Sequence, residues 1–111
     1  MELSARKEGG ILVLSVSGML DSGHANRFRE DFLDKAAEET RIVLDCEGLS
    51  YLDSSGLAIL VNIQKGLSDR DARMVICGLS DGVLRVIRFT KLDRVFSLAE
   101  NCEEALGDLS R

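Results

Sequence analysis

The hydrophobic pattern of the chain alternates between short apolar runs and longer segments with helical spacing. Short runs rich in Val, Ile and Leu are typical of strands buried in a sheet. We therefore predict five strands, over residues 3–7, 11–17, 41–46, 73–77 and 95–98. Glu8-Gly9-Gly10 between the first two strands predicts a hairpin turn, and Gly18 is expected to end the second strand.

Four further segments are predicted to be helices. Phe28, Phe32 and Leu33 recur at the spacing of an apolar helix face, which indicates an amphipathic helix packed on the sheet. The predicted helices run from the capping residues Asp21, Ser22 and Gly23 to about Glu39, from about Ser55 to Ser68, from Ser80 or Asp81 through Ile87, and from Asn101 through Leu106.

The order of these elements predicts an α/β fold. Strands that alternate with helices after residue 40 are expected to be parallel and joined by right-handed crossovers. With the hairpin added, we expect a mixed sheet of about five strands, antiparallel at its N-terminal edge, with about four helices packed on it. Because no proline, linker or low-complexity tract divides the chain, residues 1–111 are expected to form one domain.

Composition narrows the possible functions. The chain has 111 residues and a net charge of −5, with acidic and basic residues interspersed. Since no basic stripe is available to neutralise phosphates, nucleic acid is not expected as a partner. No apolar run approaches the roughly 20 residues that span a bilayer, so a membrane is not expected either.

The cysteines and the single histidine predict neither a metal site nor a set of disulfides. Cys46, Cys77 and Cys102 are far apart in the chain, and His24 cannot complete a set of ligands. Together with the absence of a signal-peptide pattern, these cysteines favour a reducing cytoplasm. We expect no cofactor, and a monomer as the default state.

A polar motif, Asp53-Ser54-Ser55-Gly56, lies between the third predicted strand and the second predicted helix. A helix start has free backbone N–H groups and the positive end of the helix dipole. A hydroxyl there is well placed to carry a phosphate. The alternative is a plain helix cap, and from these residues alone the cap is the better interpretation.

The helix that follows this motif has an unusual first turn and a half. Residues 56–61 include no polar side chain, so apolar groups point in every direction around the helix. One side is expected to cover the sheet. The other is either buried by neighbouring helices or exposed as a docking surface. We favour burial for the helix as a whole and docking for its first turn.

Two enzyme-like interpretations are disfavoured. A nucleophile elbow needs glycine two residues before its serine, where this chain has Leu52, and His24 is the only histidine that could activate Ser54. A receiver domain would use Asp45 as its phosphoacceptor, but Asp21 is a single carboxylate without the acidic neighbour that holds magnesium. Asp45 is instead expected to cap or turn the loop towards Gly48.

The order of elements, with Gly18-Met19-Leu20-Asp21 and Asp53-Ser54-Ser55-Gly56-Leu57 at the strand ends, resembles the STAS domain (sulfate transporter and anti-sigma-factor antagonist). The length is similar to that of the free-standing bacterial anti-sigma-factor antagonists. Two positions depart from the family pattern: Ala58 stands where glycine is common, and Met19 where an acidic residue is usual.

The resemblance implies a binding protein rather than an enzyme. In that family an anti-sigma serine kinase binds the antagonist and phosphorylates a serine that corresponds to Ser54, and a metal-dependent serine phosphatase restores the unphosphorylated form. The residues expected to contact the partner are Asp21, Asp53, Ser55, Gly56, Leu57 and Ala58. An adaptor subunit of a transporter or sensor complex, without phosphorylation, is the alternative.

Several of these residues have more than one possible role. Asp53 either orients Ser54 or only caps the helix. Asp21 either touches the partner or caps the first helix. Gly56 either lets another backbone approach closely or relieves crowding at the helix start.

Overall fold

The computed structural model describes residues 1–111 as a five-stranded mixed sheet with four α-helices, which confirms the predicted fold class. The strands are β1 (Glu2–Glu8), β2 (Ile11–Leu20), β3 (Arg41–Leu52), β4 (Arg73–Cys77) and β5 (Ser97–Ala99). The helices are α1 (Ala25–Lys35), α2 (Ser54–Asp69), α3 (Asp81–Phe89) and α4 (Cys102–Leu109), with a 3₁₀ helix η1 (Leu92–Arg94) after α3. The strands lie in chain order; β1 is antiparallel to β2, and every other neighbouring pair is parallel.

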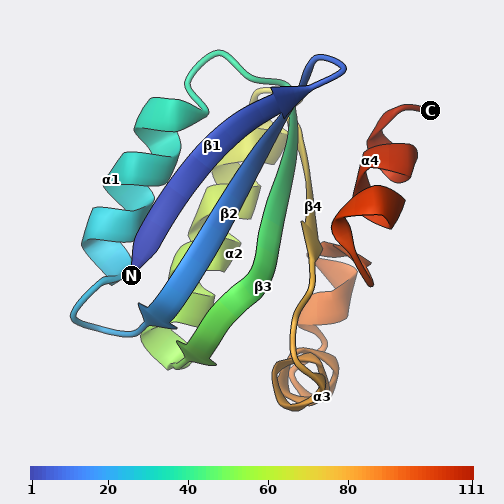
Figure 1. Ribbon diagram of the computed structural model, residues 1–111. Helices are drawn as coiled ribbons and strands as arrows, with labels where there is room; N and C mark the ends of the chain where they lie inside the picture. The colour runs from blue at the N-terminus through green and yellow to red at the C-terminus, as the bar shows by residue number, and fades with distance from the viewer.

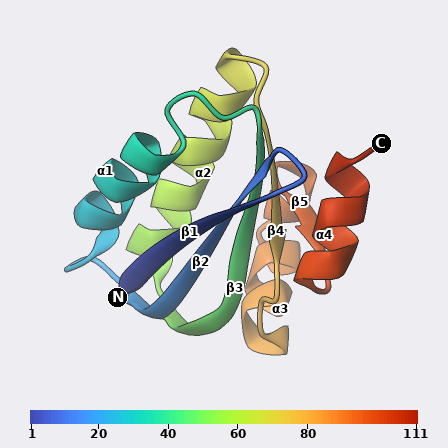
Figure 2. The same ribbon diagram turned by 45° about the horizontal axis from the view of Figure 1, so that its top comes forward.

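Helices cover both faces of the sheet (Figure 1). The larger core cluster joins one face of the strands to α1, α2 and α3 through residues such as Phe28, Leu60 and Ile87. The smaller cluster joins the opposite face to α4 through Ala105 and Leu109. Figure 2, turned to bring the top forward, shows α4 on the side of the sheet away from α1 and α2.

Strand β2 is longer than predicted and continues to Leu20. The expectation that Gly18 ends this strand is therefore wrong. Gly18 has φ of +88° and lies beside a register shift between β2 and β3, with pairing on both sides. A Cβ at this position would come within 3.2 Å of the Met1 backbone. Glycine therefore permits a bulge here rather than a strand end.

Strand β3 also extends beyond the predicted end, to Leu52 instead of Cys46. The expected turn from Asp45 towards Gly48 does not form, since Gly48 pairs with Ser17 in the ladder between β2 and β3. The Asp45 carboxylate accepts a hydrogen bond from the Glu47 N–H at 3.0 Å while remaining within the strand. As a result, the sheet itself carries the chain to the start of α2.

Helix α1 is shorter than predicted at both ends. It ends at Lys35 instead of about Glu39, because the Arg70 guanidinium donates hydrogen bonds at 2.8 Å to the carbonyls of Ala36 and Glu39 and replaces further helical bonds. At the start, no side chain caps the helix. Leu33, expected on the apolar face, is 40% exposed.

The C-terminal part differs from the prediction mainly in its boundaries. Ser80 and Asn101 cap α3 and α4 with their side chains, as expected for these positions. Helix α4 continues beyond the predicted end, and β5 begins after the buried Phe96 rather than at Val95. The 3₁₀ turn η1 was not predicted.

Candidate functional site

The ends of β2 and β3 place the two acidic loops of the chain next to each other. Met19 pairs with Tyr51 and Leu20 with Leu52 in the parallel ladder. The next residue after each strand is an aspartate, Asp21 or Asp53. The backbone N–H of Asp53 donates to the Leu20 carbonyl at 3.4 Å, so the two loops are joined from their first residue.

The Asp53 carboxylate caps α2 and also binds the neighbouring loop. Its Oδ1 accepts a hydrogen bond from the Gly56 N–H at 3.0 Å. Its Oδ2 accepts one from the Ser22 N–H at 3.3 Å. No hydrogen bond connects this carboxylate to the Ser54 hydroxyl. Asp53 therefore fixes the loop geometry around Ser54 without holding the Ser54 side chain.

Ser54 is the first residue of α2, and it is exposed. Helix geometry leaves the first N–H groups without an acceptor inside the helix, and at Gly56 the capping carboxylate supplies one. The N–H groups of Ser54 and Ser55 belong to the same first turn and have no such acceptor. An exposed hydroxyl at the positive end of a helix dipole is a position that tolerates added negative charge.

Gly56 is buried against the end of β2. A Cβ at this position would be 2.3 Å from the Leu20 carbonyl oxygen and 2.7 Å from the Leu52 side chain. The backbone that approaches Gly56 is thus the chain's own. Its role in the structure is to let α2 start directly against β2, which positions the exposed residues on either side of it.

The first turn of α2 forms a ridge between two grooves. A groove of about 440 Å³ separates it from α3 and is lined on the α2 side by Ser54 and Leu57. A second groove, of about 580 Å³, separates it from α1 and is lined on the α2 side by Ser55 and Ala58. The sequence motif therefore presents hydroxyl and apolar side chains to both grooves.

Tyr51 and Val86 are exposed apolar side chains that line the groove beside Ser54, and Met19 is the partner of Tyr51 in the sheet. Met19 is 45% exposed and Tyr51 50% exposed, and they are paired on β2 and β3. Val86 of α3 lines the same groove as Ser54 and is 51% exposed. Exposed apolar residues around a polar centre are typical of protein-binding surfaces. The only sequence signal was Met19 in the first strand-end motif, since Tyr51 lies two residues before the second motif.

Asp21 lies at the edge of this surface and hydrogen-bonds within its own loop. Its Oδ1 lies 2.7 Å from His24 Nδ1 and accepts the Gly23 N–H at 3.1 Å. The hydrogen bond from His24, more than any other interaction, holds the pKa of the Asp21 carboxyl below its usual value. Asp21 does not cap α1 with its side chain, although its carbonyl accepts the N–H groups of His24 and Ala25.

Removal of the His24 ring is expected to raise the pKa of Asp21 towards that of an ordinary aspartate. Because the folded pKa is lowered, this interaction stabilises the fold above the unfolded pKa of aspartate, and the contribution is lost as the pH falls through the folded pKa. Carboxyl ¹³C shifts recorded against pH in the wild type and His24→Ala measure the change. An Asp21 titration that is the same in both proteins would contradict it, and Asp21→Asn assigns the signal.

Other clusters in the structure do not form a reactive site. No three His, Cys, Asp or Glu side chains gather as a metal site would require. Burial raises the pKa of the Cys77 thiol to about 12 and that of Cys46 further, so neither is a ready nucleophile. None of the α-helices combines the length and the apolar character needed to cross a membrane.

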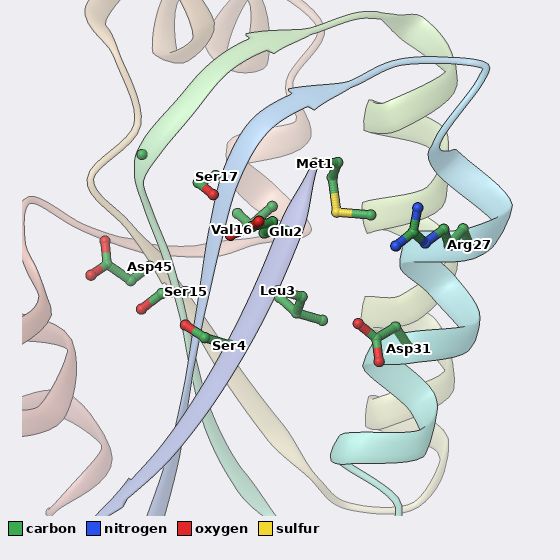
Figure 3. Close-up of a pocket in the computed structure, with 11 residues that line it drawn as sticks. Met1, Glu2, Leu3, Ser4, Ser15, Val16, Ser17, Arg27, Asp31 and Asp45 are labelled. Atoms are coloured by element: carbon green, nitrogen blue, oxygen red, sulfur yellow. The ribbon is translucent and has the colours of Figure 1, made fainter.

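A polar hollow of about 400 Å³ lies beside the first residues of β1 (Figure 3). Arg27 and Asp31 project from α1 on one side of the strands, and Ser15 and Asp45 lie on the other side. The backbone of the strands separates these groups. They do not converge on a common point, and the ridge at α2 remains the candidate site.

Residues 2–105 match the family model of the STAS domain, and the chain therefore belongs to the STAS domain family. A curated relative, the anti-sigma-B factor antagonist of Staphylococcus aureus, is 31% identical over 91 residues, which cover 81% of this chain and 84% of the relative. An anti-sigma factor antagonist from Mycobacterium paratuberculosis has a similar structure, with a TM-score of 0.85 and 23% identity over 99% of this chain and 94% of the other. The anti-sigma factor antagonist SpoIIAA, solved in its unphosphorylated form, has a TM-score of 0.70 and 20% identity, covering 96% of each chain.

Proposed function

We propose that this chain is an anti-sigma-factor antagonist whose α2 ridge binds an anti-sigma serine kinase, and that phosphorylation of Ser54 ends the binding. The observation that carries the proposal is the position of Ser54. Its hydroxyl is exposed, stands at the start of α2, and borders the groove that leads to α3. The curated relative from Staphylococcus aureus, an anti-sigma-B factor antagonist, supports the choice of function.

The docking surface in this proposal consists of the ridge and its rim. Ser55, Leu57 and Ala58 offer side chains to the two grooves beside the ridge. Asp21 borders the surface from the adjoining loop. Asp53 and Gly56 act from beneath it, by capping α2 and by allowing its close approach to β2.

The switch in this proposal is electrostatic. A phosphoserine carries about −1.5 to −2 charges, and the positive end of α2 offsets part of that charge within this protein. Acidic atoms of a partner packed over the same hydroxyl would be repelled by the phosphate. Apolar atoms there would remove its hydrating water, and both effects weaken binding. A fold that stays fixed is therefore sufficient for a large change in affinity.

The remaining chemistry in this proposal belongs to the partners. The kinase brings ATP, and a metal-dependent serine phosphatase removes the phosphate. This chain supplies a substrate hydroxyl and a binding surface, without catalysis or a cofactor of its own. The proposal places it in the cytoplasm, as a monomer.

Incubation with the cognate kinase and ATP, followed by mass spectrometry of peptides, tests the proposal. One phosphate per chain is expected on the peptide that contains Ser54, and none on the Ser54→Ala protein. Ser55→Ala is the matched control, since it removes the neighbouring hydroxyl and should still be phosphorylated. A known antagonist that the kinase phosphorylates serves as the positive control. If that control is phosphorylated and the wild-type chain is not, the proposal is overturned and a non-switching adaptor is favoured.

A further inference from the structure

The segment from α3 through η1 carries a concentration of positive charge that the fold does not use. It includes four cations, Arg85, Arg88, Lys91 and Arg94, against two carboxylates, Asp81 and Asp93, which leaves an excess of two positive charges. None of them takes part in any of the five ion pairs of the structure. The chain as a whole has a net charge of −5. A local excess of unpaired cations on an acidic protein is therefore a distinct electrostatic feature.

The outer face of α3 combines two of these cations with a large exposed apolar side chain. Asp81, Arg85, Arg88 and Phe89 line one open hollow on this helix, so two cations outnumber one carboxylate there. Phe89 is 88% exposed, the highest value among the large exposed apolar residues. The opposite side of the helix is anchored by the fully buried Ile87. We call Arg85, Arg88 and Phe89 the outer face of α3.

This outer face continues the surface around Ser54. Helix α3 also forms the far wall of the groove beside the ridge, where Val83 and Val86 line it. Figures 1 and 2 place α3 at the lower end of the molecule, the end at which β3 and the start of α2 meet. A partner that covers the groove and extends past Val86 would therefore reach Arg85, Arg88 and Phe89.

We infer that the outer face of α3 is a second docking site for the anti-sigma kinase, and that it binds an acidic segment of that kinase which also carries an apolar side chain. The inference rests on the proposed function. Arginine and aromatic residues are enriched at the energetic centres of protein interfaces, which is the composition found here. A site of this charge attracts an acidic partner before contact and raises the rate of association.

A protein occupant fits this face better than an anionic membrane. The apolar part of the face is a single phenylalanine on a helix of 9 residues, whereas interfacial helices bury a continuous apolar side. The net charge of −5 on the whole chain opposes approach to an anionic surface. The continuity with the groove next to Ser54 instead places the face within reach of a bound protein.

Lys91 adds a backbone observation to this picture. It has φ of +62°, in the left-handed region where glycine commonly ends a helix. A lysine here maintains a positive charge at a position where glycine would be less strained. The Lys91→Gly protein therefore removes one cation while relieving strain at this position, and its fold is expected to be retained.

The test is a titration of the cognate kinase with variants of the outer face. Arg85→Glu/Arg88→Glu is expected to weaken binding by about tenfold or more, mainly through slower association, and Phe89→Ser by about tenfold. Lys91→Gly is expected to weaken it by about twofold to threefold. Raising the salt from about 50 to 300 mM should weaken the wild-type complex and change the double variant much less. Thermal melting of each variant checks the fold.

The matched control is Lys65→Glu/Arg73→Glu, which makes the same change in net charge at two exposed cations outside α3 and η1. An equal loss of affinity in this control would attribute the effect to net charge and overturn the inference. The double α3 variant could bind with wild-type affinity while phosphorylation of Ser54 still abolishes binding. That result overturns the inference and leaves the proposed function intact.

Two further outcomes are decisive. Phosphatidylserine vesicles that bind the wild type but not the double variant, while kinase affinity is unchanged, would assign the face to lipid and overturn the inference. A kinase that does not bind the wild-type protein would overturn the inference together with the proposed function.

Discussion

Phosphorylated Ser54 protein is expected to bind the anti-sigma kinase about a hundredfold more weakly than the unmodified protein, and Ser54→Asp about tenfold more weakly. The reason is the placement of the hydroxyl on the ridge between two grooves, where the proposed partner would cover it. Within the isolated chain, the interaction of the added charge with the helix dipole is favourable by roughly 0.3–1 kcal/mol, so the fold should tolerate the phosphate. Isothermal titration with the three forms of the protein measures the affinities.

Two controls separate charge at this position from other effects. Ser54→Ala removes an exposed hydroxyl without adding charge and should bind within about threefold of wild type. Ser4→Asp places the same charge on exposed β1, away from the ridge, and should leave affinity unchanged. Equal affinity of the wild type, Ser54→Asp and the phosphorylated form would remove the switch.

Gly56→Ala is expected to destabilise the protein by roughly 3 kcal/mol, the upper part of the range for overpacked positions. The added Cβ would lie 2.3 Å from the Leu20 carbonyl oxygen, an atom of a central strand that cannot rotate away. Either α2 moves away from β2 or β2 bends. For a domain near this size, the melting temperature should fall by roughly 10–20 °C, as measured by circular dichroism.

Gly66 provides a matched comparison within the same helix. A Cβ at Gly66 would meet no atom within 4 Å. Gly66→Ala should therefore stabilise α2 by about 0.5–1 kcal/mol, because alanine loses less backbone freedom than glycine in a helix. If both substitutions changed the melting temperature by the same amount, the close packing of α2 on β2 would not be the cause.

The elements whose periodicity is local were predictable from the sequence. The apolar runs from Ile11 and Arg41 and the helical spacing of Phe28 and Phe32 fix the order of strands and helices. The boundaries were less predictable because they depend on distant contacts. Gly18 looks like a strand end, but pairing with β3 carries β2 through it. Helix α1 ends early because Arg70, just after α2, binds the carbonyls of Ala36 and Glu39 that follow the helix.

In the candidate site, too, the local motif was predictable from the sequence and the distant contacts were not. The motif around Ser54 predicted a helix start, and the structure places Asp53 there as its cap. What the motif does not contain is the surrounding surface. The pairing of Met19 with Tyr51, and the approach of Val86 on α3, arise from sheet register and from a crossover that joins residues far apart in the chain.

The double hydrogen bond of the Asp53 carboxylate has a consequence for recognition. Because one side chain joins the Ser22 loop to the first turn of α2, these two parts of the proposed docking surface are held together before a partner binds. Little ordering entropy is then lost on association, and more of the contact energy remains as affinity. Loss of that carboxylate, as in Asp53→Ala, would therefore reduce affinity by loosening the surface, even though the carboxylate itself need not touch the partner.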